Sequence, residues 1–167
     1  PLCETRTIMR IDRAEPNKNI VRGFKAFELL LTRHPELVGK VNFLAFLVPS
    51  RTHIRQYQRY MDEINQVINR INSKFGNGEW QPIHAFIENN YTQAIAGMKL
   101  YDALLVNTLI EGMNLVAKEG PVVNTKDGVL ILSESSGVHN QLSGPALSVS
   151  PTDIEGTMKA LYQAITM

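Results

Sequence analysis

Two glutamates stand eight residues apart in the stretch EGMNLVAKEG, which covers residues 111–120. Glu111 belongs to a Gly-Met-Asn turn, and Glu119 lies just over one turn into the helix that the following apolar run predicts. A carboxylate offers two acceptor oxygens, so Glu111 could bind sugar hydroxyls and Glu119 a ribose diol. Asn114 can cap the helix, whose first N–H groups would then favour a diphosphate. For either glutamate alone, a simple loop or helix-surface charge is the better interpretation.

Two cations follow the first predicted strand, in the stretch RIDRAEPNKNI. Arg13 and Lys18 lie five residues apart on a loop that leads into a helix start. Cations beside the positive end of a helix form a cradle for phosphate groups. A solvated loop is the alternative, because arginine and lysine are common in loops. Arg51, in VPSRTHI after the second predicted strand, is a weaker candidate, and an exposed helix-start residue is its alternative.

Apolar runs that alternate with helical patterns must position these residues. A nearly continuous apolar run such as VNFLAFLV is typical of a strand buried on both faces of a parallel sheet. The alternation repeats about six times and predicts an α/β fold: a Rossmann-like parallel sheet of about six strands with helices on both faces. Ligands bind such sheets at the carboxyl ends of the strands. We expect strands at 7–12, 41–48, 82–87, 103–107, 128–133 and 146–149, and helices at 19–34, 54–75, 92–100, 114–123 and 153–166.

Composition excludes several classes of function. The 167 residues carry a net charge of +1, with 20% charged residues, so no basic surface points to a nucleic acid. The longest apolar runs are too short to span a bilayer, and no signal peptide is visible, so we expect a cytoplasmic protein without a membrane partner. The single cysteine, Cys3, excludes an internal disulfide and a cysteine-based zinc site. Because the chain begins at Pro1, directly before a strand pattern, we expect a piece of a longer protein.

Several of these motifs, taken in order, match one known family. The succession of IDRAEPNKNI, VPSR and EGMNLVAKE resembles the carboxyl-terminal half of the trehalose-6-phosphate synthases. The resemblance continues through INSKFG, GVLILSESSG and AITM, and so covers nearly the whole chain. That family, glycosyltransferase family 20, consists of retaining enzymes with the GT-B fold, in which two Rossmann-like domains face each other across a cleft. The resemblance implies that residues 1–167 form a single domain, the donor-nucleotide-binding half of such an enzyme.

The resemblance also implies roles for individual residues. Arg13 and Lys18 match the catalytic cations on the donor diphosphate, and Glu119 matches the ligand of the donor ribose. Arg51 matches an arginine that reaches the phosphate of the acceptor sugar. The segment that meets the donor sugar and its diphosphate is matched by Glu111, Gly112, Met113, Asn114 and Leu115.

The implied reaction is transfer of a sugar from a nucleotide-sugar, such as UDP-glucose or GDP-glucose, to a phosphorylated acceptor with retention. Pre-placed cations can stabilise the departing nucleoside diphosphate. We expect no cofactor and no metal, because the sequence has no Asp-x-Asp motif. The amino-terminal domain, which would supply most of the acceptor pocket, is an implied partner. The isolated chain should therefore bind nucleotide but catalyse little.

The sequence departs from the family pattern on the sugar and acceptor side. Glu111 stands where the family usually has aspartate, and Ile110 stands where it has arginine. The first loop reads Glu-Pro-Asn-Lys-Asn in place of Asp-Tyr-x-Lys-Gly, and Tyr91 replaces a basic residue. A relative that uses another acceptor, such as glycerol phosphate or a cyclitol phosphate, is therefore an alternative.

A non-catalytic sensor of a nucleotide or a sugar phosphate is the competing class of function. Such a module would keep the fold and lose the reaction. The joint presence of Arg13, Lys18 and Glu119 favours the enzyme, because a degenerate sensor often loses one of them.

Overall fold

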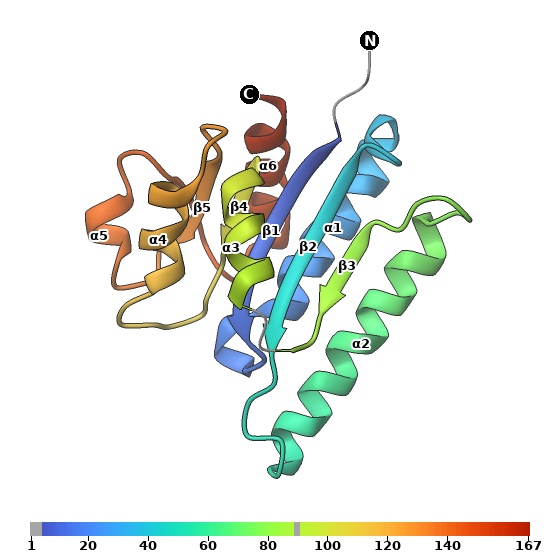
Figure 1. The fold of residues 1–167 in the computed structure, drawn as a ribbon, viewed down its shortest axis with the longest axis horizontal. Coiled ribbons are helices and arrows are strands. Elements are labelled where there is room, and N and C mark those ends of the chain that lie inside the picture. The colour runs from blue at the N-terminus through green and yellow to red at the C-terminus, as the bar shows by residue number, and fades with distance from the viewer. Residues whose placement is uncertain (1–4, 89–90) are drawn as a thin grey trace.

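The order of the strands reverses beside the first strand. The computed structural model, which describes residues 5–88 and 91–167, contains one parallel sheet in the order β3-β2-β1-β4-β5-β6 (Figure 1). This is the order of doubly wound nucleotide-binding folds, and it confirms the predicted Rossmann-like sheet. The strands are β1 (Arg6–Arg13), β2 (Val41–Val48), β3 (Ile83–Phe86), β4 (Ala103–Val106), β5 (Val129–Ser133) and β6 (Leu147–Val149).

The reversal opens a crevice at the carboxyl end of β1. This strand pairs with β2 along its whole length. Its pairing with β4 ends at Met9↔Leu104 within the described residues. The two central strands therefore separate along Arg10–Arg13. A crevice of this kind, outside the carboxyl ends of the strands, is where doubly wound sheets bind their ligands.

Helices cover both faces of the sheet. Figure 1 shows α3 crossing the near face, with α1 and α6 behind the sheet. The chain runs from β1 out to β3 and then returns to β4, so right-handed crossovers place α3 on the face opposite α1. One buried core unites α1 (Ile20–Arg33), α2 (Arg55–Phe75) and α6 (Ile154–Thr166) with the sheet, and a second unites α3 (Tyr91–Leu100) and α4 (Leu115–Val123) with it.

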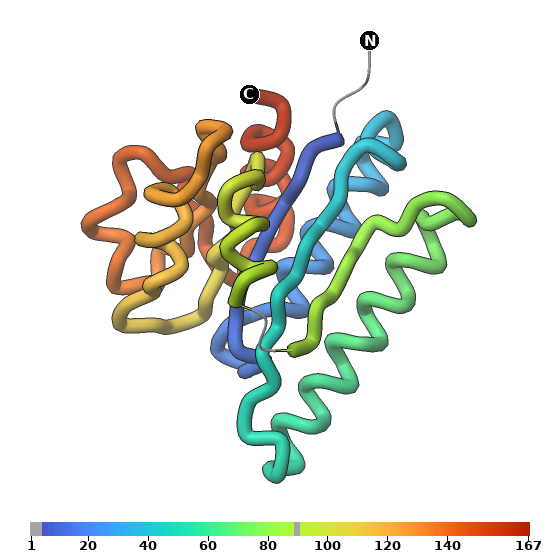
Figure 2. Tube along the Cα trace, in the orientation of Figure 1, coloured from blue at the N-terminus to red at the C-terminus, as the bar shows by residue number. Residues whose placement is uncertain are grey.

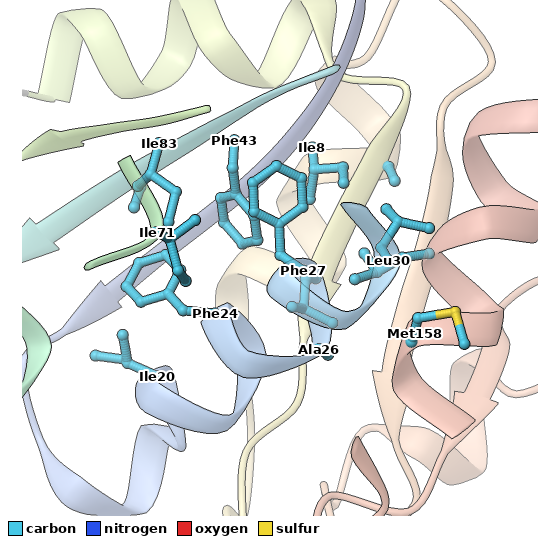
Figure 3. Packing of buried hydrophobic residues seen from close by; sticks show 14 of the residues in the cluster. Ile8, Ile20, Phe24, Ala26, Phe27, Leu30, Phe43, Ile71, Ile83 and Met158 are labelled. Carbon is cyan, nitrogen blue, oxygen red and sulfur yellow. The ribbon is translucent and has the colours of Figure 1, made fainter. Parts of the chain in front are cut away.

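Phe43 of β2 packs between two rings of α1 (Figure 3). Its ring centroid lies 5.2 Å from that of Phe24 and 5.2 Å from that of Phe27, in edge-to-face arrangements. Ile8 and Ile71 belong to the same buried cluster. Each aromatic pair adds about 0.5–1.5 kcal/mol beyond its buried area. These contacts fix α1 against the sheet, and with it the loop that enters α1.

Every predicted strand and helix is present, with ends that differ by at most one residue from the predicted ranges. The structure also contains three short elements outside these ranges: η1 (Pro16–Lys18), η2 (Pro35–Leu37) and α5 (His139–Leu142). Figure 2 shows η1 as a tight loop of the chain below β1, at the edge where the parallel strands end. None of the described helices is long and apolar enough to cross a membrane.

Gly128 precedes β5 and lies against Tyr101, a buried residue that precedes β4. A Cβ at Gly128 would lie 2.5 Å from the backbone oxygen of Tyr101. Because a backbone atom cannot yield as the end of a flexible side chain can, Gly128→Ala should lower the free energy of unfolding by about 1–3 kcal/mol. Urea denaturation measures this change. Gly144→Ala is the matched control, since nothing lies within 4 Å of a Cβ there, and equal stability of the two variants would contradict the close contact.

Candidate functional site

An ion pair joins the two loops that flank the crevice. Lys18 ends η1, after β1, and Glu111 lies in the turn between β4 and α4. The Lys18 ammonium donates a hydrogen bond to Glu111 Oε1, and the two side chains are only 9% and 13% exposed. Charges so far removed from water depend on each other, because removing one partner of a buried pair costs about 3–5 kcal/mol. The fold thus joins a cation and a carboxylate that lie 93 residues apart in sequence.

A pocket of about 310 Å³ lies beside this pair. Its wall is formed by the ends of β1 and β2 and by the start of α4, so it lies at the reversal of strand order. Size, position and polar groups agree with a site for a small ligand. The lining residues are Ile11, Asp12, Arg13, Lys18, Val48, Glu111, Met113, Asn114, Leu115 and Val116.

Asn114 fixes the start of α4 and one oxygen of Glu111. Its Oδ1 accepts a hydrogen bond of 2.9 Å from the N–H of Ala117, which confirms the predicted cap. Its Nδ2 donates a hydrogen bond of 2.8 Å to Glu111 Oε2. The two carboxylate oxygens of Glu111 are therefore held from opposite sides, by Lys18 and by Asn114. The positive end of the α4 dipole lies at the same pocket.

The turn of Glu111 is also held through its backbone. The carbonyl oxygen of Glu111 accepts a hydrogen bond of 2.7 Å from the N–H of Gly137, in the segment after β5. A Cβ at Gly137 would lie 1.9 Å from the carbonyl oxygen of Gly112. Only glycine permits this approach, so the segment after β5 supports the Glu111 turn from behind.

Asn19 clamps the loop of Lys18 to two distant segments. Its backbone lies in the left-handed region, with φ 60°, which asparagine adopts more readily than most residues. Its side-chain amide donates to the carbonyl oxygens of Asn107, at 2.8 Å, and Pro151, at 2.7 Å. The Asn107 amide returns a hydrogen bond of 3.2 Å to the carbonyl oxygen of Asn19. The loop is thereby fixed both to the end of β4 and to the segment before α6.

A buried ion pair beneath the same loop was missed by the sequence analysis. Arg10 is fully buried, and its Nε donates a hydrogen bond of 2.7 Å to Asp12 Oδ2. Burial raises the pKa of the Asp12 carboxyl above its ordinary value, and the charge of Arg10 acts in the opposite direction. The sequence did contain a signal for this pair. Arg10 and Asp12 lie two residues apart, and so face the same side of a strand whose central residues are otherwise apolar.

Three buried oxygens at this edge have no hydrogen-bond partner within the part of the chain that the structure describes. They are Asn107 Oδ1, Thr108 Oγ1 and Ser136 Oγ. The first two directly follow β4, and the third follows β5. Buried polar groups are normally paired, so their concentration here agrees with a functional edge. In residues 5–88 and 91–167 no three His, Cys, Asp or Glu side chains are grouped as metal ligands.

Comparison with known protein families matches residues 2–167 to Glycosyltransferase family 20. The chain belongs to this family. Over 162 residues it is 38% identical to the alpha,alpha-trehalose-phosphate synthase (UDP-forming) of Botryotinia fuckeliana (strain B05.10). That alignment covers 96% of this chain and 31% of the relative.

Solved structures of trehalose-phosphate synthases share the fold of this family 20 chain. An alpha,alpha-trehalose-phosphate synthase (UDP-forming) from Burkholderia xenovorans, in complex with glucose-6-phosphate, superimposes with a TM-score of 0.94 at 34% identity. A trehalose-6-phosphate protein from E. coli bound with UDP-2-fluoro glucose gives 0.93 at 31% identity. Both comparisons cover 98% of this chain, but 36% and 37% of the other chains. The chain thus spans about a third of the length of its relatives, and its place as one domain of a longer enzyme stays a prediction.

The structure gathers most of the residues that the resemblance to family 20 singled out. Arg13, Lys18, Glu111, Met113, Asn114 and Leu115 line one pocket, and Gly112 lies in its turn. Their environments differ, however. The Lys18 side chain is nearly buried, whereas that of Arg13 is 65% exposed, with NH1 3.6 Å from Glu15 Oε1.

Glu119 and Arg51 lie outside this pocket. Glu119 is exposed on α4 and makes no hydrogen bond or ion pair within the described residues. Arg51 has φ 45°, and its Cζ lies 5.7 Å from the centre of the Tyr57 ring. Its neighbours Ser50 and Thr52 line a second pocket of about 300 Å³. Neither residue lines the pocket of the ion pair, and their roles stay predictions.

The contact between Asn114 and Glu111 can be tested by the sign of a stability change. An aspartate at the cap keeps an acceptor for Ala117 and suits the helix dipole. If Asn114 were only a cap, Asn114→Asp would therefore be neutral or stabilising. Here it places a carboxylate against Glu111 Oε2, and we expect a loss of roughly 1–2 kcal/mol in urea denaturation, reduced by high salt.

The matched control uses the capped start of α6. Asp153 Oδ1 accepts from the N–H of Gly156 at the start of α6, at 2.9 Å. Asp153→Asn keeps the cap, and stability should change by less than about 0.5 kcal/mol. Stabilisation by Asn114→Asp would show that Glu111 does not face the Asn114 side chain in solution.

Proposed function

We propose that this chain is the donor-binding part of a retaining glycosyltransferase, which moves a sugar from a UDP-sugar such as UDP-glucose to a phosphorylated sugar. Membership of family 20 supports the reaction class, and the names of the relatives, UDP-forming trehalose-phosphate synthases, favour UDP over GDP. The observation that carries the proposal is the Lys18–Glu111 pair at the reversal of strand order. It offers a cation for a diphosphate and a carboxylate for sugar hydroxyls in one pocket.

Lys18 is the main candidate for stabilising the departing diphosphate. Negative charge develops on the leaving UDP, and a cation held in place beforehand needs no reorganisation during the reaction. Lys18 is nearly buried, so solvent screens its charge little, whereas the exposed Arg13 is screened strongly. Both groups would act together with the positive end of α4. Lys18 should therefore stabilise the departing diphosphate more than Arg13 does.

Binding of the donor would exchange the partner of Lys18. In the structure its ammonium is neutralised by Glu111, which keeps two nearly buried charges compatible with the fold. An entering diphosphate offers oxygens to the same ammonium. Glu111 then turns one oxygen to the hydroxyls of the sugar, while Asn114 still holds the other. The ion pair thus holds both ligands at the pocket before the donor arrives.

The remaining assignments complete the proposal. Glu119, exposed on the second turn of α4, would accept hydrogen bonds from the ribose. Arg51, beside the second pocket, would meet the phosphate of the acceptor. An amino-terminal domain would supply the rest of the acceptor site. A cytoplasmic location and independence from metals and cofactors stay predictions.

Calorimetric binding of UDP, GDP and ADP to the chain tests this site. We expect UDP to bind best, and Lys18→Ala to weaken its binding by about 1.5–3 kcal/mol, the range for hydrogen bonds to a charged group. Glu111→Gln should instead tighten UDP binding, by roughly 0.5–1.5 kcal/mol, because a neutral amide competes less strongly than a carboxylate for the Lys18 ammonium. The same variant should increase the affinity for UDP-glucose less than the affinity for UDP, since the sugar loses a charged hydrogen-bond acceptor.

Lys25→Ala is the matched control, because Lys25 is an exposed lysine of α1. It should leave the affinity for UDP unchanged. Failure of all three diphosphates to bind at millimolar concentration would reject the proposed function. Weaker UDP binding by Glu111→Gln would reject the exchange of partners.

The ribose assignment of Glu119 has its own test. If Glu119 accepts hydrogen bonds from both ribose hydroxyls, Glu119→Ala should weaken UDP binding by roughly 1.5–3 kcal/mol, and Glu119→Gln by less. The native chain should bind 2′-deoxy-UDP more weakly than UDP, and this preference should largely vanish in Glu119→Ala. A thermodynamic cycle over chain and ligand isolates the term. An unchanged preference for the ribonucleotide would remove Glu119 from the site.

A further inference from the structure

We infer that Arg10 is a positioning residue that fixes Lys18 for the diphosphate from inside the fold. The inference rests on the proposed function, because it assigns Lys18 to a phosphate group. Arg10 does not line the pocket, and it lies on β1 under the loop that carries Lys18. Its effect on a ligand would pass through the backbone of that loop.

The guanidinium of Arg10 reaches two carbonyl oxygens of the loop. Its NH2 donates to the carbonyl oxygen of Lys18 at 2.9 Å, and its NH1 reaches that of Ile20 at 3.5 Å. On the third side, Nε donates to Asp12 Oδ2 at 2.7 Å, which holds the planar group in one orientation. Both backbone contacts flank Asn19, whose backbone is in the left-handed region. Arg10 therefore fixes the turn at the point where the chain leaves η1 and enters α1.

The fold gives up space and stability to keep this arginine. Arg10 faces the α1 side of the sheet, like Ile8 two residues earlier, where an apolar side chain would pack without a desolvation cost. Room for it comes from Gly23 of α1, since a Cβ there would lie 2.4 Å from Arg10 NH1. A buried pair of this kind is a weak source of stability. The loop contacts are a function that an apolar residue could not supply.

Lys18 needs this support because its nearly buried side chain cannot easily change conformation to compensate for a displaced backbone. It is nearly buried and points at Glu111, so a displaced backbone would carry the ammonium away from the pocket. Catalytic and binding groups must be held within about 0.5 Å of their working position, and residues behind them do this. The buried guanidinium of Arg10 holds the Lys18 backbone in position from the side opposite the ligand.

The test measures the contribution of the diphosphate, as the ratio of the Kd for uridine to the Kd for UDP. General loss of structure weakens both ligands alike and leaves the ratio unchanged. The decisive variant is Arg10→Met/Asp12→Asn, which removes both buried charges and so avoids leaving an unpaired one. Arg10→Met alone, Lys18→Ala and Asp12→Asn alone are measured beside it. Asp12 lines the pocket, and its loss of negative charge should not by itself lower the ratio. Arg6→Met is the matched control, because Arg6 lies at the other end of β1 and pairs with Asp102.

We expect Lys18→Ala to bring the ratio of the two Kd values close to one. The double variant should reduce the ratio about fivefold or more, and its thermal unfolding should still be cooperative. Arg6→Met should keep the native ratio. A cooperatively folded double variant with a ratio within about twofold of native would overturn the role of Arg10 while leaving the nucleotide site intact. Absence of UDP binding by the native chain would overturn both this inference and the proposed function.

Discussion

The reversal of strand order beside β1 is the constraint on which the rest of the structure depends. A parallel sheet that grows from β1 first to one side and then to the other must separate its two central strands at their carboxyl ends. The loop after β1 and the turn after β4 are then the two segments that flank the gap. Lys18 and Glu111 meet there because the topology makes these two segments neighbours.

Four charges form a compact cluster around this gap. Arg10 and Asp12 lie inside the sheet, and Lys18 and Glu111 lie at its edge. The cluster is neutral as a whole, so the fold can keep all four groups away from water. The inner pair satisfies the backbone of the loop, and the outer pair faces the pocket. Of the inner pair only Asp12 lines the pocket, and Arg10 lies behind it, so an incoming anion would act mainly on the outer pair.

The order of strands and helices followed from the alternation of apolar runs, because hydrophobic period and turn residues are local properties. The cap at Asn114 followed in the same way, from a polar residue just before an apolar run. The pairing of Lys18 with Glu111 could not be derived, since it depends on which strands become neighbours. Arg10 was overlooked because a buried arginine contradicts the apolar pattern of its strand. The spacing to Asp12 could have indicated their ion pair, but no sequence motif records the two backbone carbonyls that Arg10 also contacts.

The hydrogen bond from Asn19 to Pro151 has a consequence for the order in which the fold can form during synthesis. Asn19 belongs to the loop after β1, and Pro151 lies between β6 and α6. The first βα unit can begin to associate early, through contacts between β1, α1 and β2. Its loop, however, gains its last anchor only when residue 151 has emerged and β6 has joined the sheet. The pocket beside the Lys18–Glu111 pair should therefore take its final form only after most of this domain has been synthesised.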